Sequence, residues 1–214
     1  MLRDDPVEWN LRYHTTRTCI AELITALEDL QPRVAILDNL APGVQRDYIY
    51  SVFKRYNLVP PPEACAWWEW ANGSTDQPTN YGTPKTFLID PWFVMSIEQA
   101  ATELEQINEI YAGIPELETI PGFFPVLHYD ASPILGFSSD PSGGLVLNHF
   151  QFPPEARPDL PKLLDDFAKM IAHGWVNTLE RDGLSLSIHR LGCAPVSLSR
   201  NLYVIALGGW CLLF

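Results

Sequence analysis

The spacing of apolar residues along this chain alternates between a helical period and a strand period, and the order of these changes limits the available folds. Amphipathic helices are predicted over 18–30, 44–56, 96–111 and 161–173. Strands are predicted near 87–89 and 92–95 and over 123–129, 134–138 and 145–150. This order is typical of an α+β fold. We therefore expect an antiparallel-rich mixed sheet flanked by helices that pack on one side of it, with an N-terminal helical extension.

Each predicted helix has a single apolar face, which we expect to be buried. The inward residues are Ile20, Leu23, Ile24 and Leu27; Tyr48, Ile49, Val52, Phe53 and Tyr56; Ile97, Ala100, Ala101, Leu104, Ile107 and Tyr111; and Leu164, Phe167, Ala168 and Ile171. Ser96 and Gln99 have the spacing of a capping box. Gly113 is expected just after the same helix, and Asp159 or Leu160 near the start of the last one.

The segment LVPPPEACAWWEWANG, from Leu58 to Gly73, is the most specific element of the sequence. Its prolines suit the first turn of a short helix. The side chains expected to face inward are Trp67 or Trp68, Cys65 and Ala71. Asn72-Gly73 is predicted to end this helix in a left-handed cap. Together these features predict a short, bulky helix packed over a sheet.

Acidic residues are concentrated in the middle of the chain. Between 56 and 156 there are thirteen acidic residues and one basic residue, Lys85, so this stretch accounts for the whole formal net charge of −12. A field of this sign repels nucleic acid and anionic membranes and attracts basic proteins. We therefore expect a basic protein as partner, and neither nucleic acid nor membrane.

Carboxylates predicted on loops or on the exposed face of a helix are the candidate contact residues. They are Glu69, Asp76, Asp90, Glu98, Glu105, Asp130 and Asp140. The helix predicted over 96–111 also carries Glu109, and it has no lysine or arginine to form the i,i+4 pairs that usually stabilise a charged face. Local helix stability does not account for this bias, whereas a basic partner would.

Sequence signatures of catalysis are absent. The chain has no glycine-rich phosphate loop, no GxSxG, no HExxH and no paired-cysteine zinc pattern. We therefore expect no catalytic residue, no metal and no cofactor. One alternative stays open, because His128 and Asp130 would share one side of a strand end and His149 could supply a third metal ligand. The simpler interpretation is that these are surface residues beside a turn.

The cysteines and the two ends of the chain give the expected environment. Cys19, Cys65, Cys193 and Cys211 show no CxxC spacing, which favours small core residues in a reducing compartment. The first ten residues contain no apolar signal region, so we expect a cytoplasmic protein. The apolar run over 202–214 is shorter than the roughly 20 residues that span a bilayer. It is expected to form a buried strand pair broken at Gly208-Gly209.

Taken in order, these motifs resemble the SUKH superfamily, which contains fungal cell-wall-assembly regulators and bacterial toxin-immunity proteins. The matching segments are 49–56, 58–60 followed by 72–73, 95–100, 123–127, 140–146 and 165–174. Lys54-Arg55 stand where the family commonly has an acidic residue. The resemblance implies a helical extension over 1–44, a SUKH-like domain over 45–175 and a C-terminal segment over 176–214 whose apolar tail packs on the domain.

Members of this superfamily are generally not enzymes, so the resemblance implies a protein-binding domain. The leading expectation is an immunity-type protein that neutralises a basic toxin, for example a nuclease, by binding it. The first alternative is a regulatory scaffold of the cell-wall-assembly-regulator type. The second is a metal-dependent enzyme built around His128, Asp130 and His149.

Overall fold

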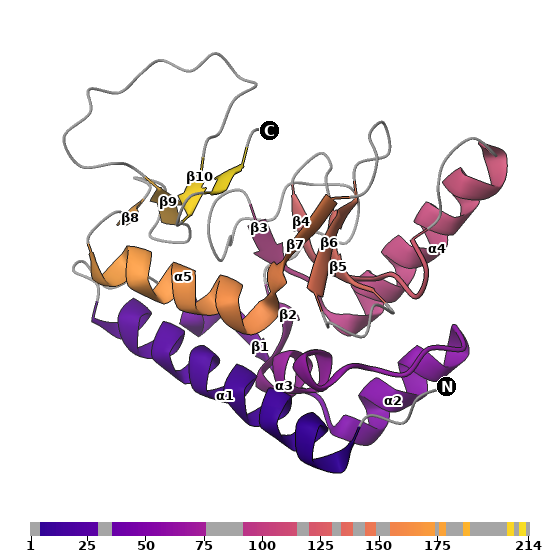
Figure 1. The fold of residues 1–214 in the computed structure, drawn as a ribbon, viewed down its shortest axis with the longest axis horizontal. Helices are drawn as coiled ribbons and strands as arrows, with labels where there is room; N and C mark the ends of the chain where they lie inside the picture. The colour runs from indigo at the N-terminus through magenta and orange to yellow at the C-terminus, as the bar shows by residue number, and fades with distance from the viewer. Residues whose placement is uncertain are drawn as a thin grey trace.

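The computed structural model describes residues 5–29, 36–75, 92–114, 120–129, 134–138, 144–148, 155–173, 176–178, 186–188, 205–207 and 210–212. Its helices are α1 (Pro6–Glu28), α2 (Arg46–Arg55), α3 (Pro62–Trp70), α4 (Ile97–Gly113) and α5 (Leu160–Ala172), with a short 3-10 helix η1 (Leu37–Asn39) (Figure 1). Its strands are β1 (Leu40–Pro42), β2 (Ala71–Ser74), β3 (Trp92–Val94), β4 (Phe124–Tyr129), β5 (Ile134–Phe137), β6 (Gly144–Asn148), β7 (Glu155–Asp159), β8 (Val176–Thr178), β9 (Leu186–Ile188), β10 (Ile205–Leu207) and β11 (Trp210–Leu212).

The central sheet is a five-stranded meander in the order β3-β4-β5-β6-β7, and each neighbouring pair is antiparallel. Three further antiparallel pairs, β1-β2, β8-β9 and β10-β11, lie outside it. The α+β class is therefore confirmed. β10 and β11 pair on either side of Gly208-Gly209, as the sequence predicts, whereas the segment 87–89 lies outside the described residues.

One face of the central sheet carries the core beneath α2 and α3. Cross-strand partners share a face of a sheet, and Phe124, Phe137 and Leu145 are partners in three successive strands. The Phe124 ring stacks on Phe53 of α2 with centroids 4.0 Å apart, and it meets Trp68 of α3 edge-on at 5.7 Å. These aromatic contacts join the two helices to the sheet.

α4 covers the opposite face. His128, Ile134 and Asn148 are partners across β4, β5 and β6, and Ile134 has the opposite parity to Phe137 on β5. Glu103 of α4 approaches His128, and the Tyr111 hydroxyl donates a hydrogen bond to Asn148 Oδ1 at 2.8 Å. Helices thus lie on both faces, and the expectation that they pack on one side is wrong. Periodicity shows that a helix has a buried side but does not show which sheet face receives it.

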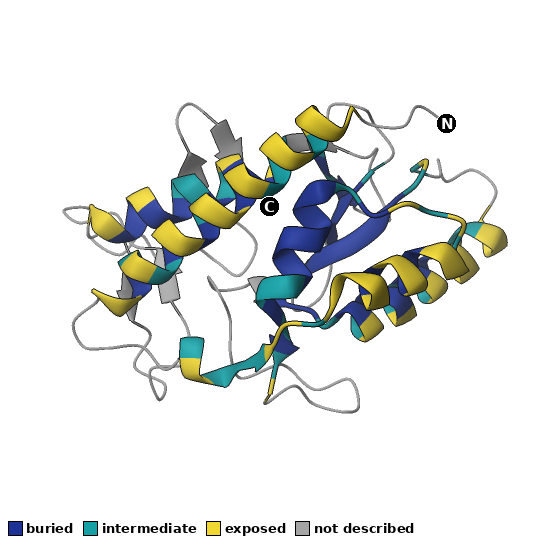
Figure 2. Cartoon of the chain, turned by 90° about the horizontal axis from the view of Figure 1, so that it is seen from below, coloured by how far each residue is buried: buried dark blue, intermediate teal, exposed yellow. Residues whose placement is uncertain are grey.

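α3 lies at the centre of the core, and Figure 2 shows it buried along nearly its whole length. Trp67 and Trp68 are both 0% exposed, so both tryptophans face inward rather than one of them. The Trp68 indole N–H donates to the Met95 carbonyl oxygen at 3.2 Å, which ties α3 to the start of α4. Cys65 and Ala71 are also buried, as predicted.

α1 belongs to the same core and packs beside α5 and α3 (Figure 1). It begins at Pro6, where the Asp5 side chain caps the first turn, so the helix is longer than the predicted 18–30. Ile20, Leu23 and Leu27 are buried as predicted. No helix in the described part of the chain is long and apolar enough to cross a membrane.

Three local predictions are wrong. Tyr48 is 41% exposed rather than inward, because the buried stripe of α2 is confined to Ile49, Val52 and Phe53. Asn72-Gly73 does not cap α3, since the helix ends at Trp70 and the next residues form β2; the φ of +83° at Gly73 falls inside that strand. Gly113 is the last residue of α4 rather than the residue after it.

The other helix signals are confirmed. α4 has the predicted capping box, with the Ser96 hydroxyl accepting from the Gln99 N–H and the Gln99 side chain accepting from the Ser96 N–H. Asp159 caps α5 through the Lys162 N–H. The predicted inward residues of these two helices are buried, except Tyr111, which is half-buried.

Candidate binding groove

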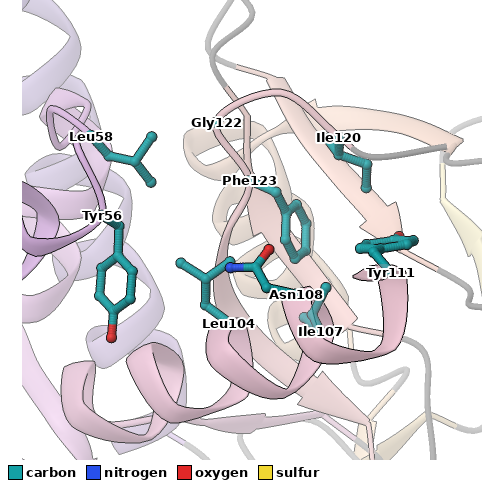
Figure 3. A pocket seen from close by; sticks show the side chains of 9 residues that line it. All are labelled: Tyr56, Leu58, Leu104, Ile107, Asn108, Tyr111, Ile120, Gly122 and Phe123. Carbon is teal, nitrogen blue, oxygen red and sulfur yellow. The ribbon is translucent and has the colours of Figure 1, made fainter. Parts of the chain in front are cut away.

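A pocket of about 210 Å³ lies between the end of α2 and the second half of α4 (Figure 3). Three segments line it: the chain after α2, one side of α4, and the turn before β4. The lining residues are Tyr56, Leu58, Leu104, Ile107, Asn108, Tyr111, Ile120, Gly122 and Phe123. Below, this site is called the groove.

The α2 wall of the groove is set by a Schellman ending. Asn57 has a φ of +57°, the left-handed conformation that follows many helices. The Leu58 N–H donates to the Phe53 carbonyl at 3.1 Å, and the Asn57 N–H donates to the Lys54 carbonyl at 3.1 Å. This reversal places Tyr56 and Leu58 side by side in one wall of the groove (Figure 3).

The opposite wall depends on Phe123 and a glycine behind it. A Cβ atom built on Gly136 would lie 2.5 Å from the Phe123 ring and 2.7 Å from the Phe124 carbonyl oxygen. Only the absence of a side chain at Gly136 leaves room for the Phe123 ring at this place on β5. Gly122, with a φ of +65°, turns the chain directly before Phe123.

α4 forms the floor of the groove. Leu104, Ile107 and Asn108 occupy successive positions on one side of the helix, and the Asn108 amide points into the space between the walls (Figure 3). The Asn108 side chain is exposed to solvent. It is therefore a polar group in a mainly apolar site, available to a bound segment.

Two carboxylates stand beside the floor residues. Glu105 and Glu109 are exposed, and they follow Leu104 and Asn108 directly in the sequence. The Tyr56 hydroxyl donates to Glu105 Oε1 at 2.7 Å, so this acid lies at the mouth of the groove. Neither glutamate forms an ion pair within the described part of the chain. On the α2 side Arg55 lies 5.9 Å from the centre of the Tyr56 ring.

Glu98, a predicted contact residue, has partners at the start of α4. It is exposed, and it accepts hydrogen bonds from Tyr48 and from Asn72 Nδ2, the latter at 3.1 Å. Burial alone would raise the pKa of Glu98, but the hydrogen bonds from Tyr48, Asn72 and Ser96 outweigh it and lower the pKa. This carboxylate also stands in the first turn, where it stabilises the positive end of the helix dipole.

Glu69, another predicted contact residue, is engaged within the protein. Its carboxylate accepts two hydrogen bonds from Arg46 and one from the Tyr13 hydroxyl. Burial favours a higher pKa for Glu69, yet the hydrogen bonds from Arg46 and Tyr13 lower it overall. With 17% of its side chain exposed, Glu69 links α1, α2 and α3, and little of it faces solvent.

The remaining predicted contact residues, Asp76, Asp90, Asp130 and Asp140, lie outside the described residues. The structure therefore brings Glu105 to the groove and separates it from Glu98 and Glu69, which have local partners. The predicted set does not include Glu109, although the sequence analysis noted it on the same charged helix.

His128, the centre of the alternative metal site, lies on β4, 3.8 Å from a Glu103 carboxylate oxygen. Burial raises the pKa of Glu103. Asp130 and His149 lie outside the described residues. Among the residues that are described, no three His, Cys, Asp or Glu side chains are grouped so that they could hold a metal ion.

Sequence reasoning missed the groove because its walls come from three separate segments. A partial signal was present: Leu58 and Val59 form an apolar pair just after a helix, and Asn108 interrupts the apolar side of α4. Neither signal identifies the turn at 120–123 as the opposite wall. That pairing follows only from the meander that brings β4 beneath α4.

No family model and no curated protein matches this chain. The SUKH resemblance therefore stays a prediction that rests on the order of motifs. What the groove can do follows from its own chemistry: an apolar cleft with one amide, and with the carboxylate of Glu105 at its mouth, can bind an apolar group that carries positive charge.

Proposed function

We propose that this chain is a non-enzymatic protein-binding domain of the immunity type, which neutralises a basic toxin by binding to it. Nucleases are one class of such toxins, because their substrate clefts are basic. The proposal takes the SUKH-like order of motifs as its family hypothesis. The acidic surface of α4 supplies its physical basis.

The proposal rests mainly on the negative charge of α4, which no basic residue of the helix neutralises. Between Ile97 and Gly113 the helix has four glutamates and no basic residue. Glu105 and Glu109 are one turn apart and exposed, and this like-charge arrangement costs a few tenths of a kcal/mol. On α5, by contrast, helical charges are paired, since Lys162 and Lys169 contact Asp166 and Asp165. A basic partner would supply the compensation that α4 lacks.

The regulatory-scaffold alternative has no comparable support. A scaffold for several partners would need more than one binding surface, and the described residues offer one groove with the exposed acidic side of α4 beside it. Of the three residues in the metal-dependent enzyme hypothesis, only His128 is described. It lies 3.8 Å from a carboxylate oxygen of Glu103. The other two residues of that hypothesis, Asp130 and His149, lie outside the described residues.

Neutralisation is tested by growth. A basic protein encoded beside this chain is expressed in a bacterial host with and without it, and the chain is expected to restore growth. In the purified pair, affinity is expected to weaken strongly between about 0.1 M and about 1 M salt, where the Debye length falls from about 10 Å to about 3 Å. Absence of rescue, or an affinity that does not change with salt, contradicts the proposal.

A matched pair of charge-reversal variants separates specific contact from net charge. Glu105→Lys with Glu109→Lys is expected to weaken binding. Glu8→Lys with Glu28→Lys changes the net charge equally at two exposed positions of α1 and is expected to bind nearly as the unmodified protein does. Equal loss in both variants would mean that only overall charge matters.

A further inference from the structure

We propose that the groove receives one aliphatic or aromatic side chain from a basic segment of the partner protein, with lysine or arginine residues of that segment facing Glu105 and Glu109. This inference rests on the proposed function and deepens it, since it names the site and the chemistry of the bound segment. Four observations support it: the size of the groove, its lining, its rim and the surface around it.

The size of the groove favours a single side chain. Pockets that hold drug-sized ligands and cofactors have volumes of roughly 300–1,000 Å³. At about 210 Å³ the groove is smaller than that range. A hydrophobic side chain inserted from a partner surface needs less room, and such anchors dominate many protein interfaces.

The lining is suited to an apolar anchor. Leu104, Ile107 and Phe123 are buried at the floor and far wall, while Tyr56 and Tyr111 are half-buried and present ring surface to the space between them (Figure 3). Aromatic residues are enriched where protein partners meet, because their rings provide apolar area with little loss of side-chain entropy.

The polar groups of the groove fix the orientation of a bound segment. The Asn108 amide points inward and can pair with a backbone N–H or carbonyl beside the inserted side chain. Glu105 accepts a hydrogen bond from the lining residue Tyr56, and Glu109 lies one helical turn further along α4, so cationic side chains of a bound segment would face this acidic side of the helix. The charge of this rim therefore selects a basic segment over a neutral or acidic one.

Exposed hydrophobic residues extend the apolar surface beyond the groove. Val59 is 56% exposed and follows the lining residue Leu58. Ile110 and Ile114 are 38% and 44% exposed, and both lie within three residues of Tyr111. An apolar patch bordered by charge is the usual form of a protein contact surface.

The test uses three fluorescein-labelled peptides and the full chain, with binding measured by fluorescence anisotropy at low salt. The first peptide, Arg-Lys-Leu-Phe-Arg-Lys, is basic and apolar; the second, Arg-Lys-Ser-Ser-Arg-Lys, is only basic; the third, Gln-Ser-Leu-Phe-Ser-Gln, is only apolar. The first is expected to bind at least about tenfold more tightly than either of the others. The apolar anchor supplies the difference from the second peptide, and the positive charges supply the difference from the third.

Two tryptophan substitutions on α4 locate the site. Asn108→Trp fills the groove and is expected to weaken the first peptide by about tenfold or more. Thr102→Trp adds the same bulk to an exposed position of α4 that does not line the groove, and it is expected to leave binding unchanged. Circular dichroism and thermal unfolding of both variants check that each is folded.

Each result has a defined meaning. Equal binding of the first and third peptides would overturn the inference in favour of an uncharged apolar occupant. Self-association of the chain that Asn108→Trp abolishes would overturn it in favour of a second copy of this protein. Undiminished peptide binding by Asn108→Trp would also overturn it.

The inference and the proposed function can fail separately. If the chain restores growth and binds its partner in a salt-dependent way, but Asn108→Trp binds that partner normally, the proposed function stands and the groove is not the contact site. If the peptide results are as expected and no neighbouring toxin is neutralised, the groove binds basic segments and the immunity function is wrong.

Discussion

The guanidinium group of Arg46 donates two hydrogen bonds to the carboxylate of Glu69, at 2.5 Å and 3.2 Å. The same guanidinium lies over two stacked rings of α1, 5.1 Å from the centre of Trp9 and 4.6 Å from that of Tyr13. One arginine therefore connects α1, α2 and α3 through both charge and aromatic contact.

This pair predicts acid sensitivity. The pKa of Glu69 is lowered in the folded protein, so its ionised form stabilises the fold above the pKa that the carboxyl has when unfolded. That stabilisation is lost as the pH falls through the folded-state pKa. In urea unfolding, the free energy of the unmodified protein is expected to fall more between about pH 5 and about pH 3 than that of Glu69→Gln. Glu28→Gln, at an exposed position of α1, is the control and is expected to follow the unmodified protein.

Removing one partner of the ion pair between Arg12 and Glu63 is expected to lower the free energy of unfolding strongly. Arg12 donates to both carboxylate oxygens, at 2.8 Å and 3.0 Å, and only 3% of the Glu63 side chain is exposed. Arg12→Met leaves that charge buried without its partner, and a loss of about 3–5 kcal/mol in unfolding free energy is expected. Chemical denaturation measures it. The double variant Arg12→Met with Glu63→Leu is expected to be more stable than Arg12→Met alone, and the opposite order would contradict this account.

Cys65 is expected to be chemically inert in the folded protein. Burial raises the pKa of its thiol to about 12, so roughly one molecule in 10⁵ carries the reactive thiolate at neutral pH. In a variant whose other three cysteines are serine, a thiol reagent is expected to react with Cys65 only when denaturant unfolds the chain. Rapid labelling of the native variant would show that α3 opens readily.

The left-handed residue at the end of α2 predicts opposite effects of two small substitutions. Asn57→Gly removes the steric cost of a φ of +57° and is expected to stabilise the protein by roughly 0.5 kcal/mol or slightly more. Asn57→Ala is expected to destabilise it by about 1 kcal/mol. Thermal unfolding measures both. If alanine were tolerated as well as glycine, the Schellman ending would not be what fixes the α2 wall of the groove.

Metal analysis tests the enzyme alternative. The purified protein is expected to contain no stoichiometric zinc or iron, since the described residues provide no cluster of ligands. His128→Ala with Glu103→Gln is the matched variant. Stoichiometric metal that this variant loses would contradict the binding-protein proposal and favour a metal site at His128.

The helices and the strands β3 to β6 could be predicted because their signals are local, whereas β7 was not predicted. The Ser96 capping box, the Asp159 cap and the apolar stripe of α4 each lie within a few residues of one another, and all are confirmed. The prediction that Tyr48 faces inward is wrong because apolar spacing alone cannot distinguish a buried ring from an exposed residue beside the buried stripe. The orientation of each helix relative to the sheet is not a local property.

The site was less predictable for the same reason. Arg12 and Glu63 are 51 residues apart in the sequence, and Arg46 and Glu69 are 23 apart, so nothing in their spacing joins them. Glu69 was therefore predicted to be a contact residue, although its partners Arg46 and Tyr13 lie within the protein. The groove likewise requires Phe123 to face α4, which depends on the strand register and on the missing side chain at Gly136.

The crossing of α4 over the sheet has a mechanical consequence. Glu103 of α4 lies next to His128 on β4, and Tyr111 of α4 contacts Asn148 on β6. Between these two contacts, Ile107 of the helix and Ile134 of β5, the cross-strand partner of both His128 and Asn148, are buried. Sliding the helix by one turn, about 5.4 Å, would set a carboxylate or a phenol against an isoleucine. The two polar contacts therefore favour one register of α4 on the sheet.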